Sequence, residues 1–151
     1  MKIKAFISIS FFYLLVPTFI NASEGIGFVI GKPSGVVLNI LSTGLDKSIN
    51  FTLSWKSSSD KYLKISADQI FYVRKGYEKK GYETEVFHLF YGYGGGIIFD
   101  NGTDLSLRLP LGIKKDFGNI DIFLEFTPFL KLVKETKGDA DIVVGARYYF
   151  K

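Results

Sequence analysis

Apolar and polar residues alternate with a period of two along most of the chain after residue 22. The clearest run is 48–57, where positions 49, 51, 53 and 55 are apolar and the positions between them are polar. This period places successive side chains on opposite faces of a β-strand. No stretch of ten or more residues has the three- to four-residue spacing of an amphipathic helix. The pattern therefore predicts an all-β protein.

Short turn sequences such as Asp100-Asn101-Gly102 separate the alternating runs. Segments 44–47, 114–119 and 133–138 are also predicted turns, and 75–85 is the one longer connection. Counting between the turns predicts eight strands, at 24–31, 35–43, 48–57, 61–74, 86–99, 103–113, 120–132 and 139–150. Short connections join antiparallel neighbours, and a closed ring leaves no strand edge exposed. We therefore predict an eight-stranded antiparallel up-and-down β-barrel.

The alternation alone leaves open which strand face points into the barrel. A soluble lipocalin-like barrel places the apolar face inside, whereas a transmembrane barrel places it against lipid. The polar face carries glycines that would make room in a narrow lumen. It also carries acidic and basic residues in near balance, which would pair there. One such pair would be Arg108 with Glu125. The predicted lumenal charge network consists of Lys64, Asp68, Arg108, Glu125, Asp141 and Arg147.

Aromatic residues make up 17% of the chain, which is explained if the apolar face is turned outward. Several predicted strands reach the 9–11 residues that cross a bilayer at a tilt. Tyrosine and tryptophan favour the membrane interface, since their rings are apolar and their polar edges stay wet. This interpretation describes a barrel without a conventional apolar core. The predicted lipid-facing or interface aromatics are Phe51, Trp55, Phe87, Tyr91, Tyr93 and Tyr148.

Residues 1–22 have the order of a secretory signal peptide: Lys2 and Lys4, an apolar run at 6–16, and the small Ala22 at the expected cleavage point. A retained transmembrane anchor is the alternative, but the run is short for a span of about 20 residues. The barrel domain is then 23–151. The chain has no cysteine, which excludes a disulfide framework and a zinc–thiolate site. The basic residues are dispersed, so no nucleic acid is expected as a partner.

The sequence also resembles a known family. The resemblance is carried, in this order, by residues 25–35 (GIGFVIGKPSG), 65–72 (ISADQIFY), 91–96 (YGYGGG), 107–113 (LRLPLGI), 120–128 (IDIFLEFTP) and 145–150 (GARYYF). Together these segments are similar to small, mostly uncharacterised outer-membrane barrels of spirochaetes and other Gram-negative-type bacteria. The resemblance implies the fold of the OmpA transmembrane domain and OmpX. It also implies that Phe150 is an assembly signal, although Lys151 follows it and departs from the usual pattern.

Little in the sequence points to chemistry. There is no Gly-x-Ser-x-Gly nucleophile elbow, and His88 is the single histidine. His88 would be the general base if the chain were an outer-membrane lipid-modifying enzyme. No cofactor and no metal site are expected.

We therefore predict a non-enzymatic, monomeric outer-membrane β-barrel with a plugged lumen, in an envelope-structural or surface-interaction role. The expected partners are outer-membrane lipid, the barrel-assembly machinery and a host or surface ligand. A secreted lipocalin-like barrel that binds an apolar ligand and the lipid-modifying enzyme remain the alternatives. With both termini in the periplasm, strand parity places the long 75–85 connection on the periplasmic side.

Overall fold

The structure is a computed structural model that describes residues 22–42, 47–58, 60–73 and 87–150. The predicted signal peptide up to residue 21, the connection at 75–85, residues 44–46 of a predicted turn and Lys151 lie outside the described residues. Within them there is no helix long and apolar enough to cross a membrane. The described elements are the strands β1 (Ala22–Lys32), β2 (Ser34–Ser42), β3 (Lys47–Lys56), β4 (Tyr62–Val73), β5 (Phe87–Asp100), β6 (Gly102–Arg108), β7 (Leu111–Phe117), β8 (Ile120–Lys131) and β9 (Lys137–Phe150).

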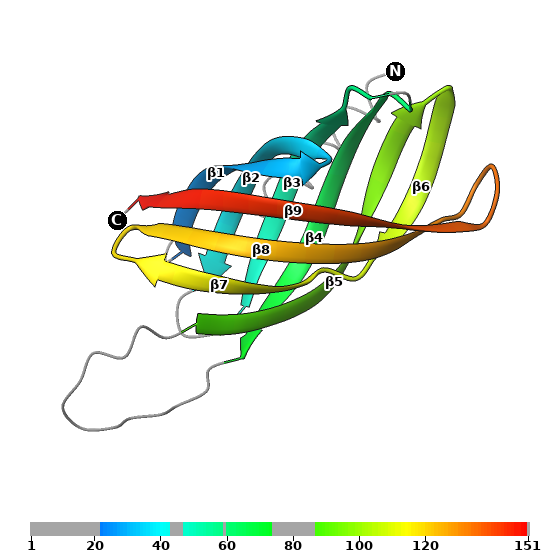
Figure 1. The fold of residues 1–151 in the computed structure, drawn as a ribbon. Coiled ribbons are helices and arrows are strands. Elements are labelled where there is room, and N and C mark those ends of the chain that lie inside the picture. The colour runs from blue at the N-terminus through cyan, green and yellow to red at the C-terminus, as the bar shows by residue number, and fades with distance from the viewer. Residues whose placement is uncertain (1–21, 43–46, 59, 74–86, 151) are drawn as a thin grey trace, which may run out of the picture.

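The strands form one closed antiparallel ring (Figure 1). Apart from β6 and β7, strands that follow one another along the chain pair with each other, and β9 pairs with β1 to close the ring. Strands β6 and β7 share one position, because each pairs with β5 on one side and β8 on the other. The ring therefore has eight strand positions, and the predicted eight-stranded up-and-down barrel is confirmed.

The predicted strand at 103–113 is interrupted at Leu109 and Pro110, which is a correction. Proline has no N–H to donate to a ladder. Two backbone hydrogen bonds still join the interrupted residues to the neighbouring strands: Gly92 N donates to Pro110 O at 2.8 Å, and Leu109 N donates to Pro128 O at 3.0 Å. Arg108 pairs with Gly94, and Leu111 pairs with Tyr91, so the register continues unchanged across the gap. The interruption leaves the inward and outward alternation intact.

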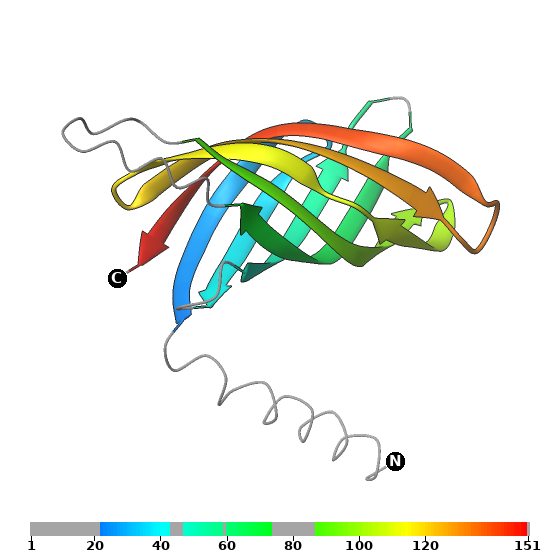
Figure 2. The same cartoon turned by 90° about the horizontal axis from the view of Figure 1, so that it is seen from below.

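The predicted turn at 114–119 is wrong for its first four residues. Residues 114–117 belong to β7, where Lys114 pairs with Phe123 and Asp116 pairs with Asp121. Only Gly118 and Asn119 form the turn, and Gly118 has the positive φ of 64° that glycine tolerates. This turn, the start of β1 and the end of β9 lie at the same end of the ring, which we call the terminal end (Figures 1 and 2).

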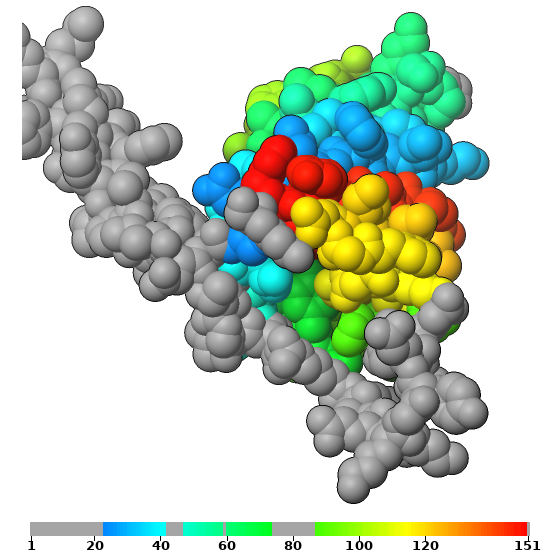
Figure 3. Space-filling view, turned by 90° about the vertical axis from the view of Figure 1, so that its left-hand side faces the viewer, coloured from blue at the N-terminus to red at the C-terminus, as the bar shows by residue number. Residues whose placement is uncertain are grey.

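The ring is apolar outside and polar inside. Along β8 the residues alternate between exposed and buried, with Leu124 and Phe126 exposed by 48% and 45% and the side chains of Asp121 and Thr127 fully buried. Most of the other strands repeat this arrangement, although β7 has no fully buried residue. Large apolar residues are exposed on the outer surface, and most buried residues are polar or charged. Figure 3 views the terminal end, where β1, β7, β8 and β9 meet.

A small apolar cluster does occur inside the ring, so the interior is more mixed than predicted. It comprises Val29, Val37, Ile70, Phe90, Phe123 and Val143, with Tyr72 packed against it. The rings of Phe90 and Phe123 meet edge to face at 6.5 Å between centroids. The alternation missed this cluster because these residues sit at polar-face positions among glycines and charged residues.

Candidate functional site

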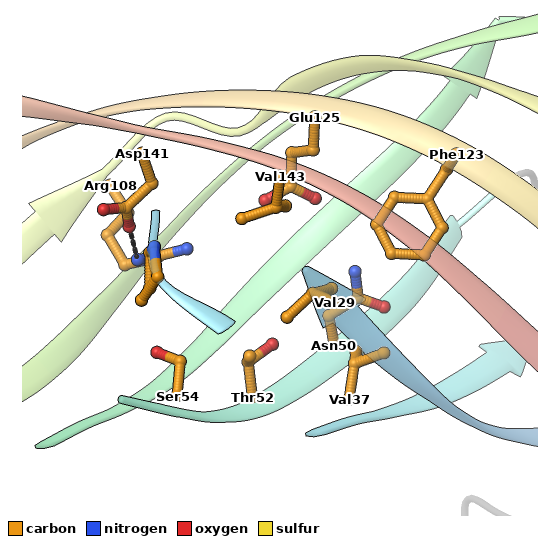
Figure 4. A pocket seen from close by; sticks show the side chains of 11 residues that line it. Val29, Val37, Asn50, Thr52, Ser54, Arg108, Phe123, Glu125, Asp141 and Val143 are labelled. Atoms are coloured by element: carbon orange, nitrogen blue, oxygen red, sulfur yellow. Dashed lines mark hydrogen bonds and ion pairs between the residues drawn. The ribbon is translucent and has the colours of Figure 1, made fainter. Parts of the chain in front are cut away.

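Two ion-pair networks cross the interior of the ring. In the first, Arg108 of β6 donates from Nε to Asp68 Oδ1 of β4 at 3.0 Å. It also donates from Nη1 to Asp141 Oδ2 of β9 at 3.2 Å, the contact drawn in Figure 4. Lys64 of β4 also ion-pairs with Asp141. Its ammonium lies 4.1 Å from the centroid of the Phe129 ring. This network ties three strand positions of the ring together.

The second network centres on Arg147 of β9 and Asp121 of β8. The guanidinium donates two hydrogen bonds to the carboxylate, from Nε at 2.9 Å and from Nη2 at 2.8 Å. Tyr149 OH donates to the same carboxylate at 2.8 Å, and Arg147 Nη1 reaches Asn50 Oδ1 at 3.4 Å. The Phe123 ring lies 4.3 Å from the guanidinium carbon, within range of a cation–π contact.

Neutral polar side chains extend the second network toward β2, β3 and β4. Asn39 donates to Asn50 Oδ1 and to Ser48 Oγ, the latter at 2.9 Å, and Ser48 shares a 2.9 Å hydrogen bond with Tyr72. Lys114 of β7 approaches this region, with its ammonium 4.7 Å from the centroid of the Tyr72 ring. The second network therefore involves strands around much of the ring.

Glu125 and Arg108 both face the interior, but they do not pair as predicted. The Glu125 carboxylate accepts a hydrogen bond from Thr127 Oγ1 at 2.7 Å. Among the described residues no basic nitrogen lies within ion-pair distance of it. Arg108 and Arg147 act on Glu125 only through their charges. Arg108 instead takes the two aspartates of the first network as partners.

The space between the networks is small. A cavity of about 20 Å³ is lined by residues that include Val29, Asn50, Arg108, Glu125 and Asp141 (Figure 4). Such a volume suits isolated water molecules, not a chain of water or an apolar ligand. Within the described residues, no group of three histidines, cysteines or carboxylates is arranged to hold a metal ion.

Two glycines leave the room that large interior side chains occupy. A Cβ added to Gly145 would lie 2.3 Å from the Phe123 ring, and one added to Gly112 would lie 2.2 Å from the Phe90 ring. No carbon atom packs at such distances, so both rings depend on the missing side chains. The glycines of the polar face therefore allow bulky groups to fill a narrow interior.

The predicted outer aromatics lie on the outer surface, all with exposed side chains. Tyr91 and Tyr93 lie inside β5, away from the strand ends expected for interface tyrosines. Tyr91 stacks on Phe71 at 5.4 Å between centroids, and Tyr93 OH donates to Gln69 Oε1 at 3.1 Å. The remaining residues of the set are Phe51, Trp55, Phe87 and Tyr148.

Phe150 ends β9 and is also exposed on the outer surface. It pairs with Glu24 of β1 in the register that closes the ring. Its ring meets Tyr148 edge to face at 5.3 Å.

His88 lies at the start of β5, near the terminal end of the ring, and its Nε2 is 3.4 Å from Asp116 Oδ2. Asp116 also accepts a hydrogen bond from Lys114 Nζ at 2.8 Å. Among the described residues no serine or threonine hydroxyl is hydrogen-bonded to His88, so the histidine has a carboxylate partner but no nucleophile. The geometry is that of a histidine beside a carboxylate at the rim of the ring.

At the end opposite the terminal end, the β5–β6 turn holds the β8–β9 connection. Lys134 Nζ donates to Asp100 Oδ1 at 2.7 Å, and Lys131 Nζ lies 3.5 Å from Asp100 Oδ2. Val133 N donates to Asp104 Oδ1 at 2.9 Å. The hydrogen bond from Lys134 holds the pKa of the Asp100 carboxyl below its ordinary value. The connection is thus fastened by carboxylates of β5 and β6.

Sequence reasoning placed the six predicted network residues on one strand face, and the structure puts all six side chains in the interior. The six did not include Asp121 and Tyr149, which the structure adds to the second network. Both share the inward parity of Arg147, since 121 lies directly opposite 147 in the ladder. The odd or even position of a residue in its strand was the available signal. It shows which side chains point inward, but not how far along the ring axis each one lies.

Comparison with known structures agrees with the fold. The N-terminal β-barrel domain of Pseudomonas aeruginosa OprF aligns over 86% of this chain and 98% of its own, with a TM-score of 0.65 and 13% identity. Neisserial surface protein A, NspA, aligns over 85% of this chain and 94% of its own, with a TM-score of 0.57 and 11% identity. No protein-family model and no curated protein sequence matches the chain. At these identities the likeness concerns the fold alone.

Proposed function

We propose that this chain is a non-enzymatic β-barrel of a bacterial outer membrane, with an envelope-structural or surface-interaction role. The observation that carries the proposal is the reversed distribution of side chains, with apolar residues outside and ion pairs inside. Monomeric soluble proteins rarely expose apolar patches above a few hundred Å². A lipid environment removes that cost, and a closed ring satisfies the backbone hydrogen bonds that lipid cannot. The similar structures named above, both outer-membrane barrels, agree with this environment.

The interior of this barrel is plugged and does not conduct. The two networks and the apolar cluster occupy the space that eight strands enclose, which is just wide enough for side chains. Among the described residues, the cavity of about 20 Å³ beside Arg108 and Glu125 supports this view. Arg108 and Arg147 are each held by carboxylates, and moving them aside would leave buried charges unpaired.

The terminal end faces the periplasm in this proposal, and residues 1–22 are the cleaved export signal. Strand parity then sends the connections after β1, β3, β5 and β8 outward. These external connections are short, so the surface available to a host or surface ligand is small. Phe150 serves as the signal to the barrel-assembly machinery, and the assembled barrel is a monomer.

The two alternatives fit less well. A lipocalin-like carrier needs an apolar cavity, whereas the described interior holds charged networks and little free volume. A lipid-modifying enzyme needs a nucleophile beside its base, whereas His88 contacts Asp116. Neither alternative has a specific observation in its favour.

Membrane fractionation combined with heat-modifiable gel mobility tests the proposal. We expect the protein in the outer-membrane fraction, extractable by detergent and not by buffer, carbonate or salt. Unboiled samples should migrate differently from boiled ones. Recovery of the protein in buffer without detergent would overturn the membrane proposal. Cleavage within 75–85 by protease added to intact cells would overturn the orientation alone.

A further inference from the structure

Glu125 differs from the other buried carboxyl groups of the ring in its partners. Its side chain is in the interior, with the residue 9% exposed, and its Oε1 accepts the hydrogen bond from Thr127. Among the described residues it is the one buried acidic residue without a basic side chain at ion-pair distance or a backbone N–H as a donor. The others have such partners: Asp68, Asp104, Asp121 and Asp141.

The nearest neighbours of Glu125 in the sheet carry no charge. Gly112 lies opposite it on β7, and Val143 lies opposite it on β9. The carboxyl group points into the cavity of about 20 Å³ (Figure 4). Apolar groups and neutral polar groups make up most of the lining: Val29, Pro33, Val37, Phe123 and Val143, with Asn50, Thr52 and Ser54. A buried carboxylate in such surroundings loses its hydration without gaining a counter-ion, which favours the neutral acid.

The charged groups that surround Glu125 are already matched with one another. The buried bases are Lys64 of β4, Arg108 of β6 and Arg147 of β9, and they pair with Asp68, Asp141 and Asp121. Lys114 of β7 lies 2.8 Å from the exposed Asp116 and 3.7 Å from Asp121. Strands β1, β2 and β3 add no buried charged residue, and the inward charges of β5, His88 and Asp100, lie near its two ends. An ionised Glu125 would therefore leave one negative charge in the interior without a partner.

We propose that Glu125 is a proton-binding site, and that the folded barrel holds one proton on this carboxyl group at neutral pH. The proton lies on Oε2, because Oε1 accepts the hydrogen bond from Thr127. A neutral carboxylic acid has one O–H donor, and this donor is directed into the cavity with its polar lining. Release of the proton to solvent leaves a carboxylate beside the Arg108 network. The inference goes beyond the proposed function, since it adds a bound proton to the plug of the barrel.

Infrared spectroscopy of the detergent-extracted full-length protein at pH 7 tests the site. The C=O stretch of a protonated carboxyl group absorbs above the carboxylate and amide bands. We expect such a band in the wild type and its loss in Glu125→Gln. Asp60→Asn is the control, since the Asp60 side chain is 86% exposed, and it should retain the band. Thr127→Val removes the hydrogen bond to the carbonyl oxygen and should move the band to higher wavenumber.

The pH dependence of stability gives a second measurement. Above about pH 4.3 the unfolded chain releases the Glu125 proton, whereas the folded barrel keeps it. Stability that depends on this proton falls as the pH rises, because the folded state binds one proton more than the unfolded state. Between about pH 6 and pH 8, the folding equilibrium constant of the wild type should fall about tenfold per pH unit relative to that of Glu125→Gln. Urea unfolding of both proteins measures the difference.

A wild-type spectrum without a protonated-carboxyl band, or a band that persists in Glu125→Gln, would overturn the inference. Parallel pH dependences of the two proteins would also overturn it. Heat-modifiable mobility shows whether each variant is folded. If Glu125→Gln does not fold, Thr127→Val decides, and an unmoved band contradicts the assignment to Glu125. Neither measurement depends on where the protein fractionates, so a negative result leaves the proposed membrane function standing.

Discussion

Arg147 and Asp121 lie directly opposite each other on β9 and β8, joined by two hydrogen bonds of 2.9 and 2.8 Å in the interior of the ring. Both side chains are only 1% exposed. A buried pair of this kind is costly to break, because the remaining partner stays charged without compensation. It also spans adjacent strands near the closure of the ring.

We expect Arg147→Leu to lower the free energy of unfolding by about 3–5 kcal/mol, because it leaves the Asp121 carboxylate buried without its main partner. Urea unfolding of the detergent-solubilised barrel, followed by gel mobility, measures the change. Asp60→Asn is the control, since it breaks the exposed pair with Lys56 at 3.9 Å and should cost less than about 1 kcal/mol. Equal effects of the two variants would contradict a buried network.

Arg108→Leu and Glu125→Gln distinguish the partners found in the structure from those predicted by sequence. Removing Arg108 leaves Asp68 and Asp141 without it, so we expect a loss of about 3 kcal/mol or more. Glu125→Gln keeps an acceptor for Thr127 and should cost about 1 kcal/mol or less. A larger loss of stability for Glu125→Gln than for Arg108→Leu in the same unfolding assay would instead support the Arg108–Glu125 pair predicted from the sequence.

Gly145→Ala should destabilise the barrel by about 1–3 kcal/mol, because the added methyl group would overlap the Phe123 ring. Combining it with Phe123→Leu should recover part of the loss. Gly138→Ala, in the same strand, is the control, since nothing lies within 4 Å of its added Cβ. If both single variants unfold at the same urea concentration, the interior is looser than the structure indicates.

Phe126→Arg tests the environment of the outer surface. Phe126 is central in β8 and 45% exposed, so arginine there would lie in the hydrocarbon region of the proposed membrane. We expect a cost of about 2–4 kcal/mol for unfolding from lipid vesicles. A solvated outer surface would instead tolerate or favour the charge, and unchanged stability would count against the lipid contact.

Acid should release the β8–β9 connection through Asp100. A carboxyl whose pKa is lowered on folding contributes stability above its unfolded pKa, about 3.9, and loses it as the pH falls through the lower folded pKa. We therefore expect the amide of Val133 to lose protection from hydrogen exchange below about pH 4. Lys134→Met should lower this protection already at pH 7, and unaltered protection in that variant would contradict the role of the pair.

The sequence predicted more of the fold than of the site. Strand β8 was predicted within one residue, because turn sequences at 118–119 and after residue 132 bound it on both sides. The gap at Pro110 was missed since the proline keeps the inward parity of its position. Parity also identified the face of Arg108, but not its partners, which lie 40 and 33 residues away in the sequence. Strand tilt and stagger decide which inward residues reach the same level, and the pattern of one strand does not contain them.

The pairing of β1 with β9 has a consequence for how the chain folds. Every other ladder joins strands that are close in sequence, whereas Glu24 and Phe150 stand opposite each other from the two extremes of the described chain. The entropy of long-range loop closure therefore falls on this single seam. A circular permutant joined near residues 22 and 150 and reopened at Asn101 would turn that seam into a local hairpin. Ring closure would then depend on the pairing of β5 with β6, so the long-range step should move to these two strands while all of the ladders are kept.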